Sequence, residues 1–144
     1  MILEPGIHVE TNLDSLAQAL REAEQNGFRL FNIDLGPGAG NKQELFDRLK
    51  IGLSLPEYFG ANWDALEESL RDFEIGQNTG FLLVFGSADA LLRLPPSDRR
   101  TLVSIQEEAA RFWQTEGVPF SSVFVGSAGL AEAIASANER HVRS

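Results

Sequence analysis

Cysteine is absent from this sequence of 144 residues. The absence excludes disulfide bonds, thiolate metal sites, iron–sulfur ligation and a cysteine nucleophile. It also removes any sign that the chain is adapted to an oxidising compartment. Redox chemistry performed by the chain's own side chains is therefore excluded by composition.

Histidine is scarce as well, with His8 and His141 near opposite ends of the chain. Neither has a histidine or a carboxylate at a metal-ligand spacing on a convincing helix. Because both histidines lie near the ends of the chain and cysteine is absent, the sequence also gives little support for a Ser–His or Cys–His nucleophilic pair. We therefore expect no metal site, no cofactor and no enzymatic activity.

Long apolar runs are missing. The longest, such as FLLVF at residues 81–85, are far too short to cross a bilayer. The first ten residues, MILEPGIHVE, lack the basic and apolar stretches of a secretion signal. We expect a cytoplasmic protein that does not enter a membrane.

Positive charge is in short supply, because 12 Lys+Arg stand against 21 Asp+Glu and give a net charge of −9. This balance argues against direct binding of nucleic acid or of an anionic membrane, and it favours a basic partner. Hydrophobic residues make up 43% and charged residues 23%, which is typical of folded soluble proteins. The length fits a single domain over residues 1–144.

A glycine-rich loop, GPGAGNK, occupies residues 36–42. It lies between a predicted strand and a predicted helix, where such loops can bind phosphate. A phosphate-binding P-loop has Ser or Thr after Gly-Lys, but here Asn41 separates Gly40 from Lys42, and Gln43 follows. We interpret the loop as a flexible turn.

Hydrophobic spacing predicts strands that alternate with helices. Apolar runs predict three strands, at residues 28–35, 81–85 and 120–125. Helical spacing predicts helices at residues 13–25, at 41–50, after Asn62 as the N-cap, at 98–115 and at 130–137. The pattern predicts an α/β fold with a small three-stranded parallel sheet packed with helices, preceded by an N-terminal helical extension. As an alternative, residues 7–9 would add a fourth strand at an edge.

Acidic residues concentrate between residues 57 and 74, where six of them stand against Arg71 alone. The resulting net charge of −5 is more than half of the total. Like charges four residues apart on a helix repel each other. The helix dipole favours only a carboxylate near the helix start, such as Asp64. The six acidic residues are Glu57, Asp64, Glu67, Glu68, Asp72 and Glu74.

Three aromatic residues, Tyr58, Phe59 and Trp63, are interleaved with these acids. We expect Phe59 and Trp63 to reach the core. Aromatic rings beside carboxylates are typical of interface hot spots, so the segment is interpreted as an acidic interaction face. Two alternatives remain: a merely solvated helix face, and an enzyme that uses Asp64 and Glu68 as an acid/base pair.

The run LPEYFGANWDAL at residues 55–66, followed by Leu70, resembles the signature of the barstar family of intracellular ribonuclease inhibitors. In this motif Gly60 would permit a tight turn and Asn62 would cap the helix that presents the acids. The resemblance covers a barstar-like core at residues 28–126. It leaves an N-terminal extension at residues 1–27 and a C-terminal helix and tail at residues 127–144.

The resemblance implies a three-stranded parallel sheet and a partner, namely a barnase-like ribonuclease. In barstar-like inhibitors the loop and helix enter the basic active-site cleft, and carboxylates occupy the places of substrate phosphates. By position, Tyr58 and Asp64 match family contact residues, Glu68 stands where the family has a second aspartate, and Glu67 replaces a tryptophan. The expected partner-binding residues are Tyr58, Asn62, Asp64, Glu67, Glu68 and Asp72.

The leading hypothesis is an inhibitor or immunity protein that blocks the basic active site of a ribonuclease. A second hypothesis is an acidic protein-binding module on the same scaffold with a different basic partner. We expect a monomer when the protein is free, because no large apolar stripe is evident in the sequence.

Overall fold

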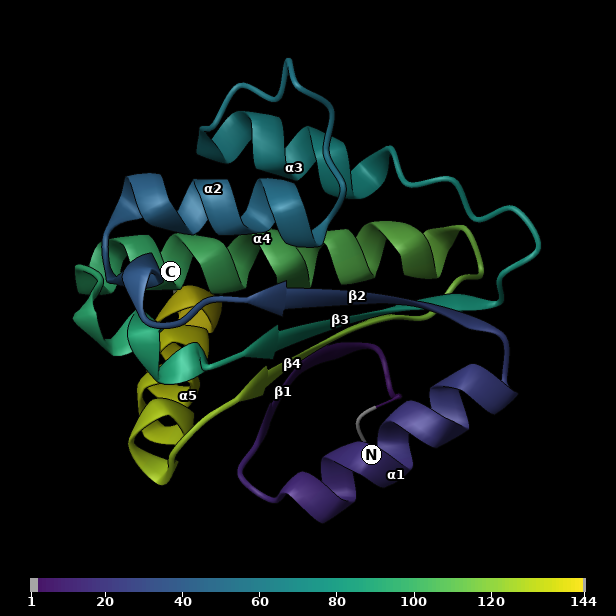
Figure 1. The fold of residues 1–144 in the computed structure, drawn as a ribbon, viewed down its shortest axis with the longest axis horizontal. Coiled ribbons are helices and arrows are strands. Elements are labelled where there is room, and N and C mark those ends of the chain that lie inside the picture. Colours follow the sequence, from purple (N-terminus) through teal and green to yellow (C-terminus); the bar gives the residue numbers. More distant parts are fainter. Residues whose placement is uncertain (1–2, 144) are drawn as a thin grey trace.

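The computed structural model describes residues 3–143. Within these residues a parallel sheet has four strands in the order β1-β4-β3-β2 (Figure 1). The strands are β1 (Gly6–Glu10), β2 (Phe28–Asp34), β3 (Gly80–Gly86) and β4 (Phe120–Val125). The α/β class and the three predicted strands are confirmed. The prediction of a three-stranded sheet is wrong, because a fourth strand is present.

The additional strand is β1, the segment considered above as an alternative at the sheet edge. It pairs with β4 in parallel, beginning with Gly6 opposite Ser121. Only Ile7 and Val9 of this strand pack against the main core, so its hydrophobic pattern is short. Because its partner lies far away along the chain, no local feature of the sequence reveals the pairing. The N-terminal extension therefore supplies an edge strand as well as a helix.

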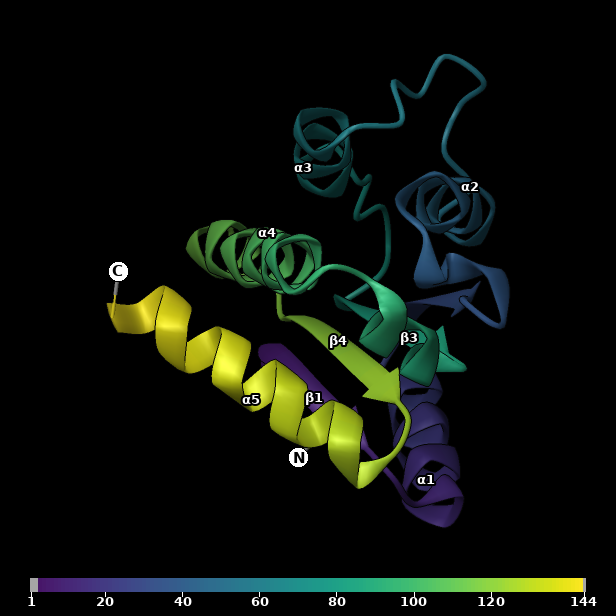
Figure 2. The same ribbon diagram turned by 90° about the vertical axis from the view of Figure 1, so that its left-hand side faces the viewer.

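Five α-helices lie in the described residues. Figures 1 and 2 show α2, α3 and α4 on one face of the sheet, α1 on the other, and α5 near the end where the strands finish. All five occur where helical spacing predicts them, although α5 continues further than expected. Their bounds are α1 (Leu13–Gln25), α2 (Lys42–Gly52), α3 (Trp63–Arg71), α4 (Pro96–Thr115) and α5 (Ala128–Arg143). In the part of the chain that the structure describes, no helix is long and apolar enough to span a membrane.

The glycine-rich loop at residues 36–42 connects β2 to α2, as predicted, and forms a short 3-10 helix at Gly38–Gly40; its flexibility stays a prediction. Asn41 ends the loop and caps α2, because its side-chain oxygen accepts a hydrogen bond from the Glu44 N–H at 2.9 Å. A Cβ atom at Gly40 would lie 2.7 Å from Arg93 Nε. This glycine therefore makes room for a neighbouring side chain.

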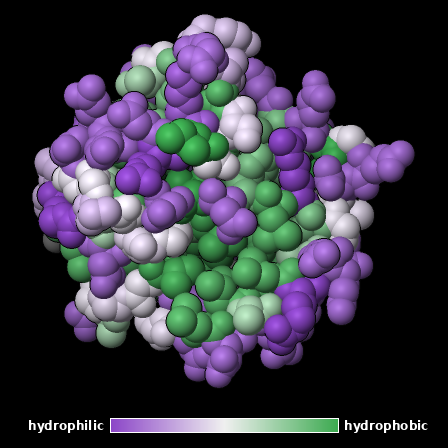
Figure 3. Space-filling model, in the orientation of Figure 1, coloured by the Kyte–Doolittle hydropathy of each residue, from purple (hydrophilic) through white to green (hydrophobic). Residues whose placement is uncertain are grey.

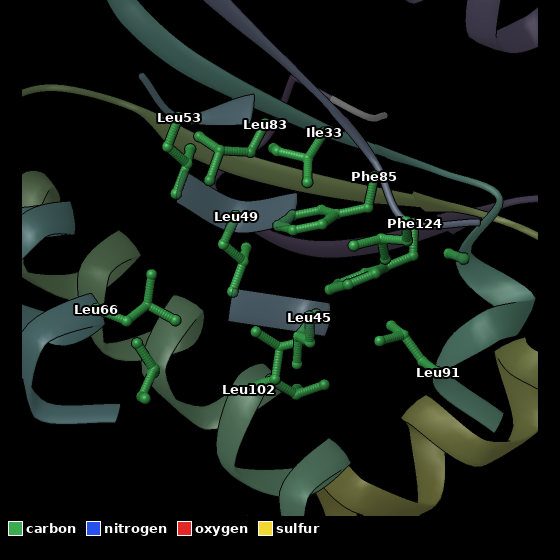
Figure 4. Packing of buried hydrophobic residues seen from close by; sticks show 14 of the residues in the cluster. Ile33, Leu45, Leu49, Leu53, Leu66, Leu83, Phe85, Leu91, Leu102 and Phe124 are labelled. Atoms are coloured by element: carbon green, nitrogen blue, oxygen red, sulfur yellow. The ribbon is translucent and has the colours of Figure 1, made fainter. Parts of the chain in front are cut away.

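The main core lies between the sheet and helices α2, α3 and α4. Figure 4 shows side chains from β2, β3 and β4 pointing towards leucines of the three helices. The rings of Phe85 and Phe124 stack at 4.6 Å between centroids. Every residue from 81 to 85 is buried, as expected for a central parallel strand.

The opposite face of the sheet is covered less completely. A smaller cluster forms between α1 and the sheet, around Ala23, Leu82, Val84 and Val123. Figure 3 shows an apolar area over the region where β2 and α1 lie in Figure 1. The monomer stays a prediction. It was based on the lack of a large apolar stripe in the sequence, and the apolar area on this surface removes that support.

Candidate protein-binding face

Helix α3 presents most of the acidic residues. Its inward side carries Leu66 and Leu70, each 1% exposed. The indole Nε1 of Trp113 on α4 donates a hydrogen bond to the Leu70 carbonyl at 2.9 Å. The helix is oriented by two buried leucines one turn apart and by this hydrogen bond. Its opposite side therefore faces solvent.

Asn62 caps the start of α3, which confirms the prediction of its structural role. Its Oδ1 accepts a hydrogen bond from the Ala65 N–H at 2.8 Å. Its Nδ2 donates to the Gly60 carbonyl at 3.1 Å. One side chain therefore holds both the first turn of the helix and the loop before it.

The turn in this loop is made by a different residue from the one expected. Ala61, not Gly60, adopts the left-handed conformation, with a φ of 49°. Gly60 provides space instead, because a Cβ atom there would lie 3.2 Å from Asn62 Nδ2. The glycine of the motif thus allows the loop to pack closely against the capping side chain.

The three aromatic residues of the segment divide into two groups. Phe59 and Trp63 are half-buried and pack on Phe46 of α2, with ring centroids 6.3 Å and 4.9 Å away, which confirms that they reach the core. Tyr58 is 89% exposed. The buried rings anchor the loop on α2, and Tyr58 is left as a large side chain available for a partner.

Two of the six acidic residues are paired within the chain. Arg71 Nη1 donates to Glu67 Oε1 at 2.9 Å, and Lys50 Nζ lies 3.2 Å from Glu57 Oε2. No cation of the described side chains lies within 4 Å of the other four carboxylates. The unpaired acids, all exposed, are Asp64, Glu68, Asp72 and Glu74.

Asp64, Glu68 and Asp72 follow one another at intervals of four residues. At this spacing they lie along one side of α3, with Asp72 as its C-cap. Repulsion within this stripe costs a few tenths of a kcal/mol for each pair of like charges, about 0.2–0.5 kcal/mol. A positively charged partner would offset that repulsion between the carboxylates on binding.

A hollow of about 570 Å³ lies beside the stripe, between α3, the preceding loop and the start of β2. Three of the predicted residues, Tyr58, Glu68 and Asp72, line it together. Glu74 and Arg29 complete the charged part of its lining. Among the described residues, the lining of the hollow is therefore acidic overall and holds one cation, Arg29.

The other three predicted residues do not line the hollow. Asp64 is on the same stripe one turn before Glu68, Asn62 is the cap, and Glu67 is engaged with Arg71. Sequence reasoning missed Arg29. The spacing along β2 could have found it. Residues two apart on a strand face the same side of the sheet, so Arg29 shares the side of Phe31 and Ile33.

Metal-binding side chains are not grouped in the described part of the chain, where no cluster of three or more His, Asp or Glu could hold a metal ion. His8 Nε2 lies 2.7 Å from the Glu4 carbonyl oxygen. The side chain of His141 lies outside the described ones.

Fold and site together define a chain with a parallel sheet and an acidic loop–helix segment beside it. Residues 28–125 match the family model described as Barstar (barnase inhibitor). The chain belongs to the barstar family. The matched residues run from β2 to β4 and include α3 and the residues around the hollow, whereas β1 and α1 precede them. The family description names an inhibitor and not an enzyme. A search of curated proteins finds no similar sequence.

Proposed function

We propose that this protein is an inhibitor or immunity protein that binds the basic active-site cleft of a ribonuclease through α3 and the loop before it. The observation that carries the proposal is the set of four exposed, unpaired carboxylates beside the exposed Tyr58. Asp64 and Glu68 lie on the capped helix α3, Asp72 is its C-cap and Glu74 follows it, in a member of a family of barnase inhibitors. In the cleft these carboxylates would take the places of substrate phosphates.

Electrostatics would act on this association in two ways. Opposite net charges steer the encounter and raise the association rate above the neutral range of about 10⁵–10⁶ M⁻¹s⁻¹. Affinity comes from charge pairs that lose their water at the interface. Leaving one charge of such a pair without its partner costs about 2–5 kcal/mol, a range to which barnase and barstar themselves contributed.

The partner-binding residues have unequal parts in this proposal. Asp64, Glu68 and Asp72 supply unpaired negative charge, and Tyr58 supplies apolar contact area. Asn62 acts through the cap. Glu67 contributes least, because Arg71 already neutralises its charge. The protein would work in the cytoplasm, where it meets the nuclease before export or after entry.

Inhibition of a ribonuclease tests the proposal. Barnase is assayed on RNA while the purified protein is added, and we expect activity to disappear at a one-to-one ratio. Full activity in the presence of a large excess would contradict the proposal for barnase-type nucleases.

A second candidate is a binding module for another basic protein. Two residues of α3 favour it, because the resemblance to the family motif implies an aspartate and a tryptophan at the positions where this chain has Glu68 and Glu67. Capture of a basic protein without nuclease activity from the native cell, lost in Asp64→Ala, together with no inhibition of barnase, would support this candidate.

A further inference from the structure

Arg29 is a cation that lines the acidic hollow. It is the second residue of β2, and its side chain shares the hollow with Glu68, Asp72 and Glu74. The residue is half-buried, and its guanidinium lies over the ring of Phe31, with Cζ 4.6 Å from the centroid. The Phe31 ring is 4% exposed and stacks on Phe73 at 4.7 Å. The cation is thus held by an aromatic stack that belongs to the core.

The donors of Arg29 are not used within the described side chains. The three ion pairs there join Lys42 to Asp98, Lys50 to Glu57 and Arg71 to Glu67, and none includes Arg29. The nearby carboxylates of the hollow therefore lie more than 4 Å from its nitrogens. A guanidinium carries five N–H donors in a planar fork, so its hydrogen-bonding capacity is open to a ligand.

Two anionic groups fit such a fork, namely carboxylate and phosphate. The surroundings decide between them. Glu68, Asp72 and Glu74 would repel the multiple charges of a nucleic acid backbone. A single carboxylate of a partner protein would be repelled less if cations lie beside it on the partner. Those cations would then contact Glu68, Asp72 and Glu74 and offset the repulsion.

We infer that Arg29 binds a carboxylate of the partner protein, while Glu68 and Asp72 bind the partner's neighbouring cations. This inference rests on the proposed function and specifies its partner. The partner must present an acidic side chain within its basic cleft, as an active site does when a carboxylate acts as proton acceptor beside cationic groups. Arg29 is then a residue that selects a cleft of mixed charge over one that is only basic.

The inference makes a prediction whose sign is opposite to that of simple charge attraction. If Arg29 only dilutes the acidic face, its removal makes the protein more negative and tightens binding to a basic nuclease. If it pairs with a partner carboxylate, its removal weakens binding. The loss expected is about thirtyfold or more, the lower bound of 2 kcal/mol converted at 1.4 kcal/mol per tenfold.

Dissociation constants for barnase provide the test. Arg29→Met keeps an apolar stem over Phe31 and is compared with Arg21→Met, which removes an exposed cation on α1. We expect Arg29→Met to bind about thirtyfold more weakly than Arg21→Met. Equal or tighter binding of Arg29→Met overturns the inference and leaves the proposed function intact.

A variant of the probe decides the question even if Arg29→Met fails to fold. Barnase with its active-site carboxylate replaced by the matching amide is bound to the unaltered protein. The inference predicts weaker binding of this variant. Tighter binding would show that the carboxylate is only repelled by Glu68 and Asp72 and would overturn the inference. No binding of either form of barnase would overturn the proposed function for barnase-type nucleases, and this inference with it.

Discussion

Arg29 and Gln106 are polar side chains placed among apolar neighbours, but for different physical reasons. Arg29 lies at the rim of the core, where it packs over Phe31 and lines the hollow. Gln106 on α4 is 1% exposed, and its Nε2 donates to the Leu102 carbonyl at 3.3 Å. Its Oε1 is buried and has no hydrogen-bond partner among the described side chains. The spacing of the sequence places both residues on inward faces, but it does not reveal which donors and acceptors remain unpaired.

Gln106→Leu is therefore expected to stabilise the protein. A buried acceptor without a partner costs about 1–3 kcal/mol, and leucine would remove it while filling the space among Leu49, Leu66 and Leu83. We expect the free energy of unfolding in urea to rise by about 1 kcal/mol or more. The exposed Gln114 on the same helix provides the control, since Gln114→Leu should change stability little. A loss of stability in Gln106→Leu would contradict this interpretation.

The elements of the fold differ in how well the sequence predicts them. α3 was predictable down to its first residue, because Asn62 is a strong cap and buried leucines follow it at helical spacing. β1 was predicted only as an alternative, over residues 7–9, because its five residues owe their conformation to pairing with β4. In the loop before α3, the motif does not show that Ala61 takes the left-handed conformation that Gly60 was expected to supply.

The two asparagine caps predict a separation of stability from binding. Asn12 caps α1 and Asn62 caps α3 through the same type of hydrogen bond. Asn12→Ala and Asn62→Ala should each lower the free energy of unfolding by about 1 kcal/mol. Only Asn62→Ala should also weaken binding to barnase, because it releases the loop that carries Tyr58. Equal affinities of the two variants, measured by calorimetry, would argue against a role of this loop.

The whole molecule carries a charge of −9, and the fold decides what that charge can do. Composition alone predicts a basic partner without giving its place of contact. In the structure, Glu57 and Glu67 form ion pairs with Lys50 and Arg71. The remaining negative charge of this segment lies along one side of α3 and just after its end. The hollow next to it, which Arg29 lines, depends on β2 and α3 coming together. This juxtaposition is a property of the tertiary fold and could not be predicted from spacing.

The central claim is that the acidic side of α3 binds a ribonuclease, and two matched aspartates test it most directly. Asp64 and Asp14 are both exposed, and each lies two residues after an asparagine cap in the first turn of its helix. Their replacement by alanine therefore removes the same charge and the same dipole interaction. We predict that Asp64→Ala raises the dissociation constant for barnase about thirtyfold or more, from a cost of about 2–5 kcal/mol, whereas Asp14→Ala leaves it nearly unchanged. Equal dissociation constants for the two variants would contradict the account.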